Sequence, residues 1–157
     1  MEQNLGNLSY LIQREIQMPL LANFLRDFIL ELGYDQTMAI ANKTIQRDGA
    51  KAGRAMAEKY GANAISDLHR VIGEVWAQEG ALEFEVLEIT ENRLRFNVTR
   101  CRYAELYDRL GIKEFGYCFS CNRDEPLIRA FNSRMKLLRS QTIMQGDRIC
   151  DFQIFLE

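Results

Sequence analysis

The sequence contains a single histidine, His69, and this scarcity excludes several common catalytic designs. A catalytic Ser-His-Asp or Cys-His set would need His69, and nothing in the sequence brings it near the cysteines, which lie within residues 101–150. Patterns such as H-E-x-x-H, a Gly-rich phosphate loop or a Walker sequence are missing as well. His69 shares a helical side with Ile65 and Leu68, so we expect it to be a core or partly buried side chain.

The chain also lacks an excess of one charge and any long apolar run. Its 20 basic and 22 acidic residues are interspersed, so we expect no nucleic-acid partner and no membrane-binding arm. No apolar run approaches the ~20 residues of a membrane span. Residues 1–10 lack the basic and apolar regions of a secretory signal. We therefore expect a cytoplasmic protein with reduced cysteines.

Repeats and Pro/Ser-rich linkers are absent, and 157 residues suffice for one hydrophobic core, so we expect a single domain over 1–157. Residues 1–78 show helical periodicity, and residues 79–157 read as hairpins and short helices. The predicted fold class is α+β, in which N-terminal helices pack with an antiparallel sheet of about four strands, with short helices between two hairpins.

Apolar residues recur every four positions over 8–28, which predicts a long first helix with a kink or break caused by Pro19. Gly33 is expected to end it and Asp35 to cap a second helix that runs to about Tyr60. The first helix carries more apolar surface than one face needs. We therefore hypothesise a homodimer.

The first hairpin is predicted from strict alternation on both sides of residues 90–92. A three-residue loop there pairs Val86 with Phe96 and Phe84 with Val98, which places both apolar rows on one face.

A second hairpin is predicted from residues 136–144 and 148–156 around a Gly146-Asp147 turn. It would pair Ile143 with Cys150 and Thr142 with Asp151. Aspartate is depleted from strands, so the carboxylate of Asp151 must be hydrogen-bonded or paired, or its pKa rises.

The four cysteines are Cys101, Cys118, Cys121 and Cys150. Cys118 and Cys121 form a C-x-x-C pair, for which we consider redox chemistry, a zinc site completed by Cys101 and Cys150, and packing as small apolar side chains. Packing is the interpretation we prefer for Cys118.

Cys101 ends the strand "LRFNVTR" and opens the helix "CRYAELY". A thiol at a helix N-terminus has its pKa lowered by the helix dipole and free N–H groups, as a nucleophile requires, although this is also an ordinary way to begin a helix. Asp124 stands where an N-cap of the helix "EPLIRAF" is expected.

Several stretches together resemble the L-2-amino-thiazoline-4-carboxylic acid hydrolase family. They are "REIQMPLLANFLRDFILELG", "LRFNVTRCRYAELYDRLGIKEFGYCFSCNRD" and "RSQTIMQGDRICDFQIFLE". The similarity spans nearly the whole chain, and its ending is the most specific part. More distantly, the closing strand is similar to those of ligand-binding domains related to vinyl reductases and Bet3 trafficking proteins. This resemblance implies a helix-covered antiparallel sheet with a pocket.

The family resemblance implies a hydrolase that opens a small cyclic amidine or isothiourea at a C–N or C–S bond. The implied catalytic residues are Cys101 and Cys121, as nucleophile or ligand, and Asp124 and Asp151, which would bind the amidine and relay protons. The implied substrate-binding residues are Arg100 or Arg123 for a carboxylate, Thr142 to orient Asp151, and Cys150.

A small-molecule substrate is the expected partner, and no cofactor is expected, with zinc at the four cysteines as an alternative. The competing class is a non-catalytic binding or sensor domain with the same pocket. A cysteine that reacts unusually fast near neutral pH would favour the enzyme, whereas inert thiols would favour the binding domain.

Overall fold

The computed structural model describes residues 8–61 and 63–157. Two long helices come first, α1 (Tyr10–Leu32) and α2 (Tyr34–Tyr60), separated only by Gly33. Gly33 has a φ of 83°, a left-handed backbone that glycine adopts without strain, so it ends α1 as predicted. Asp35 lies in the first turn of α2 rather than at its N-cap. The helix α1 continues through Pro19, so of the expected kink or break, a break is excluded and a kink stays a prediction.

The other elements follow in chain order. They are α3 (Ile65–Val71), β1 (Leu82–Ile89), β2 (Arg93–Cys101), α4 (Arg102–Arg109), α5 (Gly116–Phe119), α6 (Asp124–Phe131), β3 (Met135–Leu138) and β4 (Cys150–Leu156). Short helical turns join several of them, among them a π-helical turn at Ile72–Trp76 and 3-10 turns at Cys121–Arg123 and Ile143–Gln145.

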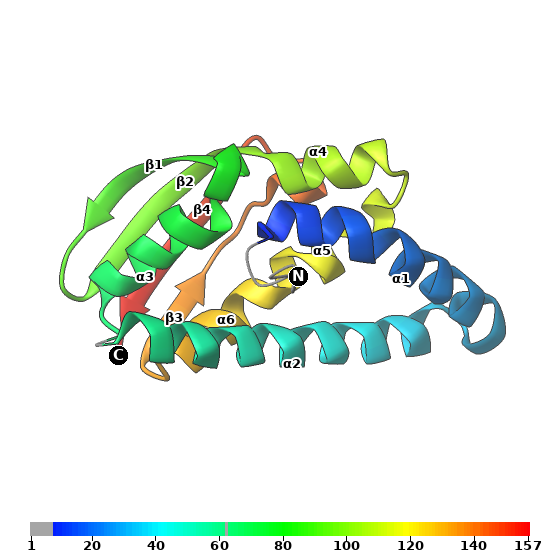
Figure 1. Cartoon of the computed structure of the whole chain (residues 1–157), viewed down its shortest axis with the longest axis horizontal. Coiled ribbons are helices and arrows are strands. Elements are labelled where there is room, and N and C mark those ends of the chain that lie inside the picture. Colours follow the sequence, from blue (N-terminus) through cyan, green and yellow to red (C-terminus); the bar gives the residue numbers. More distant parts are fainter. Residues whose placement is uncertain (1–7, 62) are drawn as a thin grey trace, which may run out of the picture.

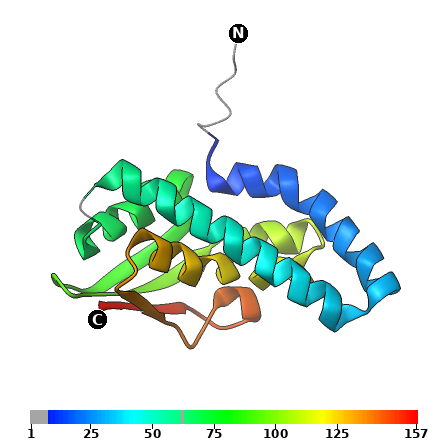
Figure 2. The same ribbon diagram turned by 90° about the horizontal axis from the view of Figure 1, so that it is seen from below.

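The strands form one antiparallel sheet in the order β1-β2-β4-β3, which confirms the predicted α+β class. Helices gather on one face of this sheet, and the α1–α2 hairpin extends beyond it (Figures 1 and 2). The first hairpin has the predicted register, with Val86 opposite Phe96 and Phe84 opposite Val98. Burial of Phe96 and Val98 against the helices fixes this register, because a slip of one residue would turn the apolar row to solvent.

The second hairpin differs from its prediction. Its strands are antiparallel neighbours, but Met135 pairs with Leu156 and Leu137 with Ile154, a register two residues away from the predicted one. Residues 139–149 form a long connection with a 3-10 turn rather than a tight turn at Gly146-Asp147. Thr142 therefore does not lie opposite Asp151 in a ladder.

Helix α2 approaches α6 and the turn before it very closely. A Cβ on Gly53 would lie 2.2 Å from the carbonyl oxygen of Leu127, and one on Gly49 would lie 2.8 Å from that of Arg123. Only glycine permits such backbone contact. The two glycines therefore fix the position of residues 123–127, which contribute to the candidate site.

Helix α1 is not simply amphipathic, because large apolar side chains lie on its exposed side and an arginine lies on its buried side. Its buried stripe consists of Leu11, Arg14, Met18, Ala22 and Leu25. The residues that repeat every four positions lie largely outside: Ile16, Leu20, Phe24 and Phe28 are 65%, 64%, 52% and 49% exposed. An apolar stripe on this scale is typical of an interaction surface. The homodimer stays a prediction.

Across residues 8–61 and 63–157, no helix combines the length and the apolar character that a membrane crossing requires.

Candidate active site

A cavity of about 80 Å³ lies between the start of α1, the sheet and the segment that joins α5 to α6. Its apolar wall includes Trp76, Val98, Leu127 and Phe152. Its charged, thiol and serine side chains are Arg14 of α1 and, from the C-terminal half of the chain, Cys101, Ser120, Cys121, Arg123, Asp124, Arg139 and Cys150. A small concave space with apolar walls and a few convergent polar groups is typical of a site for a small molecule.

Three of the four cysteines meet at this cavity. Cys101 ends β2, Cys121 opens the turn before α6, and Cys150 begins β4 opposite Val98. Cys118 is buried on α5 and does not line the cavity, in keeping with the packing interpretation. Of the C-x-x-C pair, Cys118 therefore belongs to the core and Cys121 to the cavity wall. Within the described ranges, no group of three or more His, Cys, Asp or Glu side chains is arranged to hold a metal ion.

The thiols in the cavity are held in their neutral form. Burial raises the pKa of Cys101 to about 11, although the backbone N–H groups of Ala104 and Tyr103 act in the opposite direction. Burial likewise raises the pKa of Cys150 and raises that of Cys121 well above its ordinary value. The expected lowering of the Cys101 pKa by the start of α4 is therefore corrected, because desolvation outweighs the helix N-terminus.

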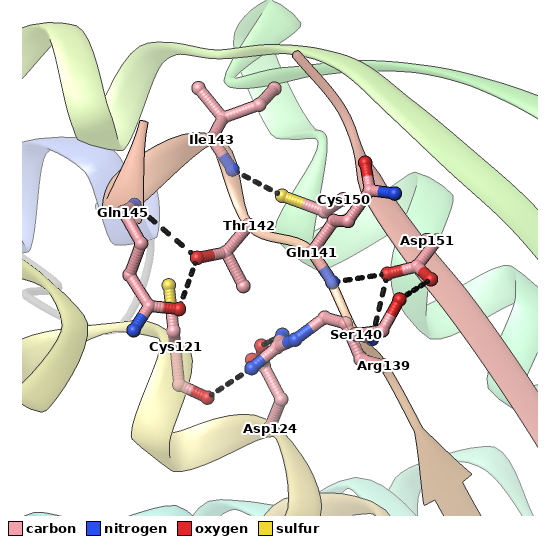
Figure 3. A network of polar contacts seen from close by, with 10 residues as sticks. All are labelled: Cys121, Asp124, Arg139, Ser140, Gln141, Thr142, Ile143, Gln145, Cys150 and Asp151. Carbon is pink, nitrogen blue, oxygen red and sulfur yellow. Dashed lines mark hydrogen bonds and ion pairs between the residues drawn. The ribbon is translucent and has the colours of Figure 1, made fainter. Parts of the chain in front are cut away.

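A buried ion pair joins Asp124 to Arg139 at one side of the cavity (Figure 3). Arg139 Nη1 lies 2.5 Å from Asp124 Oδ2, and Arg139 Nη2 donates a 3.1 Å hydrogen bond to the carbonyl of Cys121. The side chains are only 7% and 19% exposed. Burial raises the pKa of Asp124, and Arg139 partly offsets that rise. The N-cap of α6 is Arg123, so Asp124 is not the cap that the sequence predicted.

Arg14 brings a second buried cation to the cavity. It is 5% exposed, its guanidinium stacks on the ring of Tyr10, and it donates a 3.4 Å hydrogen bond to Gln17. Among residues 8–61 and 63–157, no carboxylate lies within 4.0 Å of its guanidinium. Burial lowers the pKa of Arg14, and the charge of Arg123 adds to this effect. A buried cation without a carboxylate is costly unless an anion joins it.

The remaining predicted arginines lie in different surroundings. Arg123 lines the cavity and pairs with Asp48 of α2. Arg100 is exposed outside the cavity, where it binds Glu105 at 2.7 Å and Glu83 at 3.2 Å. The structure therefore does not bring Arg100 together with the cysteines and Asp124.

Asp151 lies outside the cavity and holds the chain directly after Arg139. Its carboxylate accepts hydrogen bonds from Ser140 N at 2.9 Å, Ser140 Oγ at 2.6 Å and Gln141 N at 2.7 Å (Figure 3). Partial burial acts to raise its pKa, but these hydrogen bonds outweigh it and hold the pKa below its ordinary value.

Thr142 does not orient Asp151, contrary to the role that the resemblance implied. Its hydroxyl donates to Gln145 Oε1 at 2.8 Å, and its backbone N–H donates to Asp147 Oδ2 at 2.9 Å. These contacts shape the 3-10 turn before β4.

Replacing Asp151 with alanine is expected to lower the free energy of unfolding by about 1–3 kcal/mol at pH 7, because three donors lose a charged acceptor. A carboxyl whose pKa is lowered by folding stabilises above its unfolded pKa, near 3.9, and this contribution disappears as the pH falls through the folded pKa. Urea denaturation at pH 7 and near pH 3.5 measures both effects. Gln153→Ala, an exposed change on the same strand, is the control. If the loss of unfolding free energy in Asp151→Ala were as large at pH 3.5 as at pH 7, the ionised carboxylate would not be what holds Ser140 and Gln141.

His69 is partly buried against the sheet, with its ring edge-on to Phe84 at 6.4 Å between centroids, as the sequence predicted. It does not line the cavity. Sequence reasoning missed Arg14 and Arg139. Arg14 could have been found, because it interrupts the apolar spacing of Leu11, Met18, Ala22 and Leu25 on the buried side of α1. Arg139 follows an edge strand and carries no comparable signal.

Solved structures share this fold at low sequence identity. A trafficking protein particle complex subunit 3 from Naegleria fowleri, solved covalently bound to palmitic acid, matches with a TM-score of 0.54 and 16% identity, over 91% of this chain and 96% of that one. The phenol-responsive sensory domain of the transcription activator PoxR, solved with phenol, matches with a TM-score of 0.57 and 10% identity, over 90% and 75%. An H-NOX domain from Shewanella oneidensis matches with a TM-score of 0.51 and 13% identity, over 91% and 77%.

No curated protein matches the sequence significantly. The family model described as L-2-amino-thiazoline-4-carboxylic acid hydrolase matches residues 13–154, which include every polar residue named in the cavity. The chain therefore belongs to the L-2-amino-thiazoline-4-carboxylic acid hydrolase family.

Proposed function

We propose that the protein hydrolyses a small cyclic amidine or isothiourea that carries a carboxylate, such as 2-amino-thiazoline-4-carboxylate. The observation that carries this proposal is the pairing of opposite binding groups in one small cavity. Arg14 is a buried cation with no carboxylate within 4.0 Å among the described residues, and Asp124 carries a largely buried carboxyl group. A ligand with an anionic end and an amidine end complements both.

Arg14 would receive the substrate carboxylate, with Arg123 adding positive charge on the same side. Asp124 would accept hydrogen bonds from the amidine N–H groups, as carboxylates do with guanidinium-like groups. This arrangement would hold the amidine carbon near the thiols of Cys101, Cys121 and Cys150. Arg139 would act as a positioning residue, because it fixes Asp124 and the backbone of Cys121.

The reaction consumes one water for each ring opened. The water oxygen becomes bonded to the amidine carbon, the ring C–S or C–N bond breaks, and the released sulfur or nitrogen takes up a proton. Because its pKa is raised, Asp124 is a better proton acceptor than an ordinary carboxylate. It would take the proton either from the attacking water or from Cys121, whose thiol would then add to the carbon first.

A non-catalytic sensor is the second candidate, and the neutral state of the thiols favours it. All three thiols of the cavity have raised pKa values, so none is a ready nucleophile in the free protein. The PoxR domain, a phenol-responsive sensor, has the same overall fold. Under this reading the cavity would bind a small carboxylate and leave it unchanged.

Incubation of the purified protein with 2-amino-thiazoline-4-carboxylate tests the proposal, with mass spectrometry to detect a product heavier by one water. The expected result is catalytic turnover that survives Cys118→Ala, outside the cavity, and falls sharply in Cys121→Ala. Turnover that persists in single alanine variants of all three cavity cysteines would assign the attack to water. Saturable binding without turnover would overturn hydrolysis of this substrate and support the sensor.

A further inference from the structure

Four aromatic side chains line the cavity of the candidate site, and two of them already carry a cation. The guanidinium of Arg14 lies over the ring of Tyr10, 5.3 Å from its centroid, and that of Arg139 lies 4.8 Å from the centroid of Phe152. Within residues 8–61 and 63–157, no arginine or lysine stacks on the indole of Trp76. The face of an indole attracts a cation more strongly than that of any other aromatic side chain. Trp76 is therefore the residue of this cavity best suited to stack on a cationic ligand.

The backbone around Trp76 is unusual and well fixed. It ends the π-helical turn Ile72–Trp76, in which the N–H of Ala77 donates a 2.8 Å hydrogen bond to the carbonyl oxygen of Ile72. The carbonyl of Trp76 accepts a 3.1 Å hydrogen bond from the hydroxyl of Tyr103, which also lines the cavity. Turns of this kind are rare and occur frequently at functional sites. Because Trp76 is also buried, its ring is a preformed part of the cavity wall.

The charges already in the cavity leave a cationic ring in need of a further stabilising group. The carboxylate of Asp124 is paired with Arg139, so it offers a bound amidinium only part of its negative charge. A cation taken out of water is costly unless other groups stabilise it. In the proposed substrate the carboxylate is balanced by Arg14, so the protonated ring depends on an aromatic face for the remaining stabilisation.

We propose that Trp76 is a substrate-binding residue that stacks on the protonated amidine ring and selects cationic rings over neutral rings of the same shape. This inference rests on the proposed function, because it places the ring of that substrate in the same cavity. Water that attacks the amidinium carbon makes it tetrahedral and ends the delocalisation of the positive charge. The stacking is therefore strongest before the reaction, and it contributes to binding and not to the chemical step.

Two ligands that differ mainly in charge test this proposal. 2-Amino-imidazoline-4-carboxylate is a cyclic guanidinium that stays protonated and is much less electrophilic than the thiazoline, and 2-oxo-imidazolidine-4-carboxylate is the neutral cyclic urea of similar shape. Calorimetry on the full chain measures the preference for the cationic ligand over the neutral one. We expect this preference to fall about tenfold in Trp76→Leu and by a smaller factor in Trp76→Phe. With 2-amino-thiazoline-4-carboxylate itself, Trp76→Phe should raise KM and leave kcat unchanged.

The wild-type protein provides a second measurement without any substitution. Trp76 is the only tryptophan of the chain, so its fluorescence emission should change as the cationic ligand saturates the cavity. Phe84→Leu is the control variant, because Phe84 packs edge-on against Phe96 in the core and does not line the cavity. Its preference for the cationic ligand should equal that of the wild type.

The outcomes separate this inference from the proposed hydrolysis. An unchanged preference in Trp76→Leu, or an emission that does not respond to a ligand that calorimetry shows to bind, would overturn the role of Trp76 even if the protein hydrolyses 2-amino-thiazoline-4-carboxylate. A preference that depends on Trp76, without turnover, would uphold the stacking site and overturn only the hydrolysis. An absence of saturable binding of the cationic ligand would also overturn the stacking site. If Trp76→Leu does not fold, Trp76→Phe and the emission titration decide in its place.

Discussion

Replacing Arg139 with methionine is expected to lower the free energy of unfolding by about 3–5 kcal/mol at pH 7 and to abolish most activity. Methionine keeps much of the volume but leaves Asp124 as a buried carboxylate without its cation. It also removes the hydrogen bond to the carbonyl of Cys121 and the stacking of the guanidinium on Phe152, 4.8 Å from the ring centroid. Both side chains of the pair are less than a third exposed, so solvent screens little of this loss.

The loss should shrink as the pH is lowered. Burial already raises the pKa of Asp124, and Arg139 is the main group that opposes this rise, so its removal raises the pKa further. Between the unfolded pKa, near 3.9, and the raised folded pKa, the folded protein binds more protons than the unfolded chain. Stability therefore falls as the pH rises through this window, and the variant should approach the wild type in acid. Urea denaturation at pH 7 and pH 5 measures the difference.

Arg129→Met is the matched control, because Arg129 forms an exposed ion pair with Glu125 on α6, the helix that carries Asp124. Its cost should stay within about 0.5 kcal/mol at either pH. The double variant Asp124→Leu with Arg139→Met should recover much of the stability, because two apolar side chains replace the buried pair. A single variant as stable as the control would show that the pair carries no buried charge.

Replacing Arg14 with methionine should have opposite effects on activity and stability. If Arg14 binds the substrate carboxylate, its loss should raise KM about 10- to 100-fold, which corresponds to a hydrogen bond to a charged group. The free energy of unfolding should remain unchanged or increase, because the variant no longer buries a cation that lacks a carboxylate partner within residues 8–61 and 63–157. Steady-state kinetics and chemical denaturation measure the two quantities.

A substrate analogue without the carboxylate separates this role from a general loss of structure. Wild type and Arg14→Met should process it equally poorly, because the interaction that Arg14 supplies is absent in both. Arg100→Met is the control, since Arg100 is exposed and pairs with Glu83 and Glu105 on the surface. Its KM should not change. A large KM effect in Arg100→Met, with none in Arg14→Met, would return the carboxylate site to Arg100, one of the two arginines that the family resemblance implied.

Local patterns predicted the parts of the fold that depend on neighbours in sequence. Alternation around residues 90–92 was sufficient for the central pairs of β1 and β2, because β2 buries one face, Phe84 of β1 packs against the core on that face, and the connecting loop is short. It did not predict the two register shifts on either side of these pairs. The closing hairpin failed for the opposite reason. Residues 139–149 are held by side chains, with Asp151 bound to Ser140 and Gln141, and no periodic pattern encodes such bonds.

The candidate site shows the same difference between what local sequence predicts and what tertiary packing decides. The sequence by itself determined the α+β class, the helix limits near Gly33 and Tyr60, and the concentration of the thiols and Asp124 within residues 101–150. Only the tertiary structure decided that Cys101, Cys121 and Cys150 share a cavity from which Cys118 is separated. It also brought Arg14 from the opposite end of the chain. Burial then set the charges, because desolvation depends on everything packed around a group and not on its neighbours in sequence.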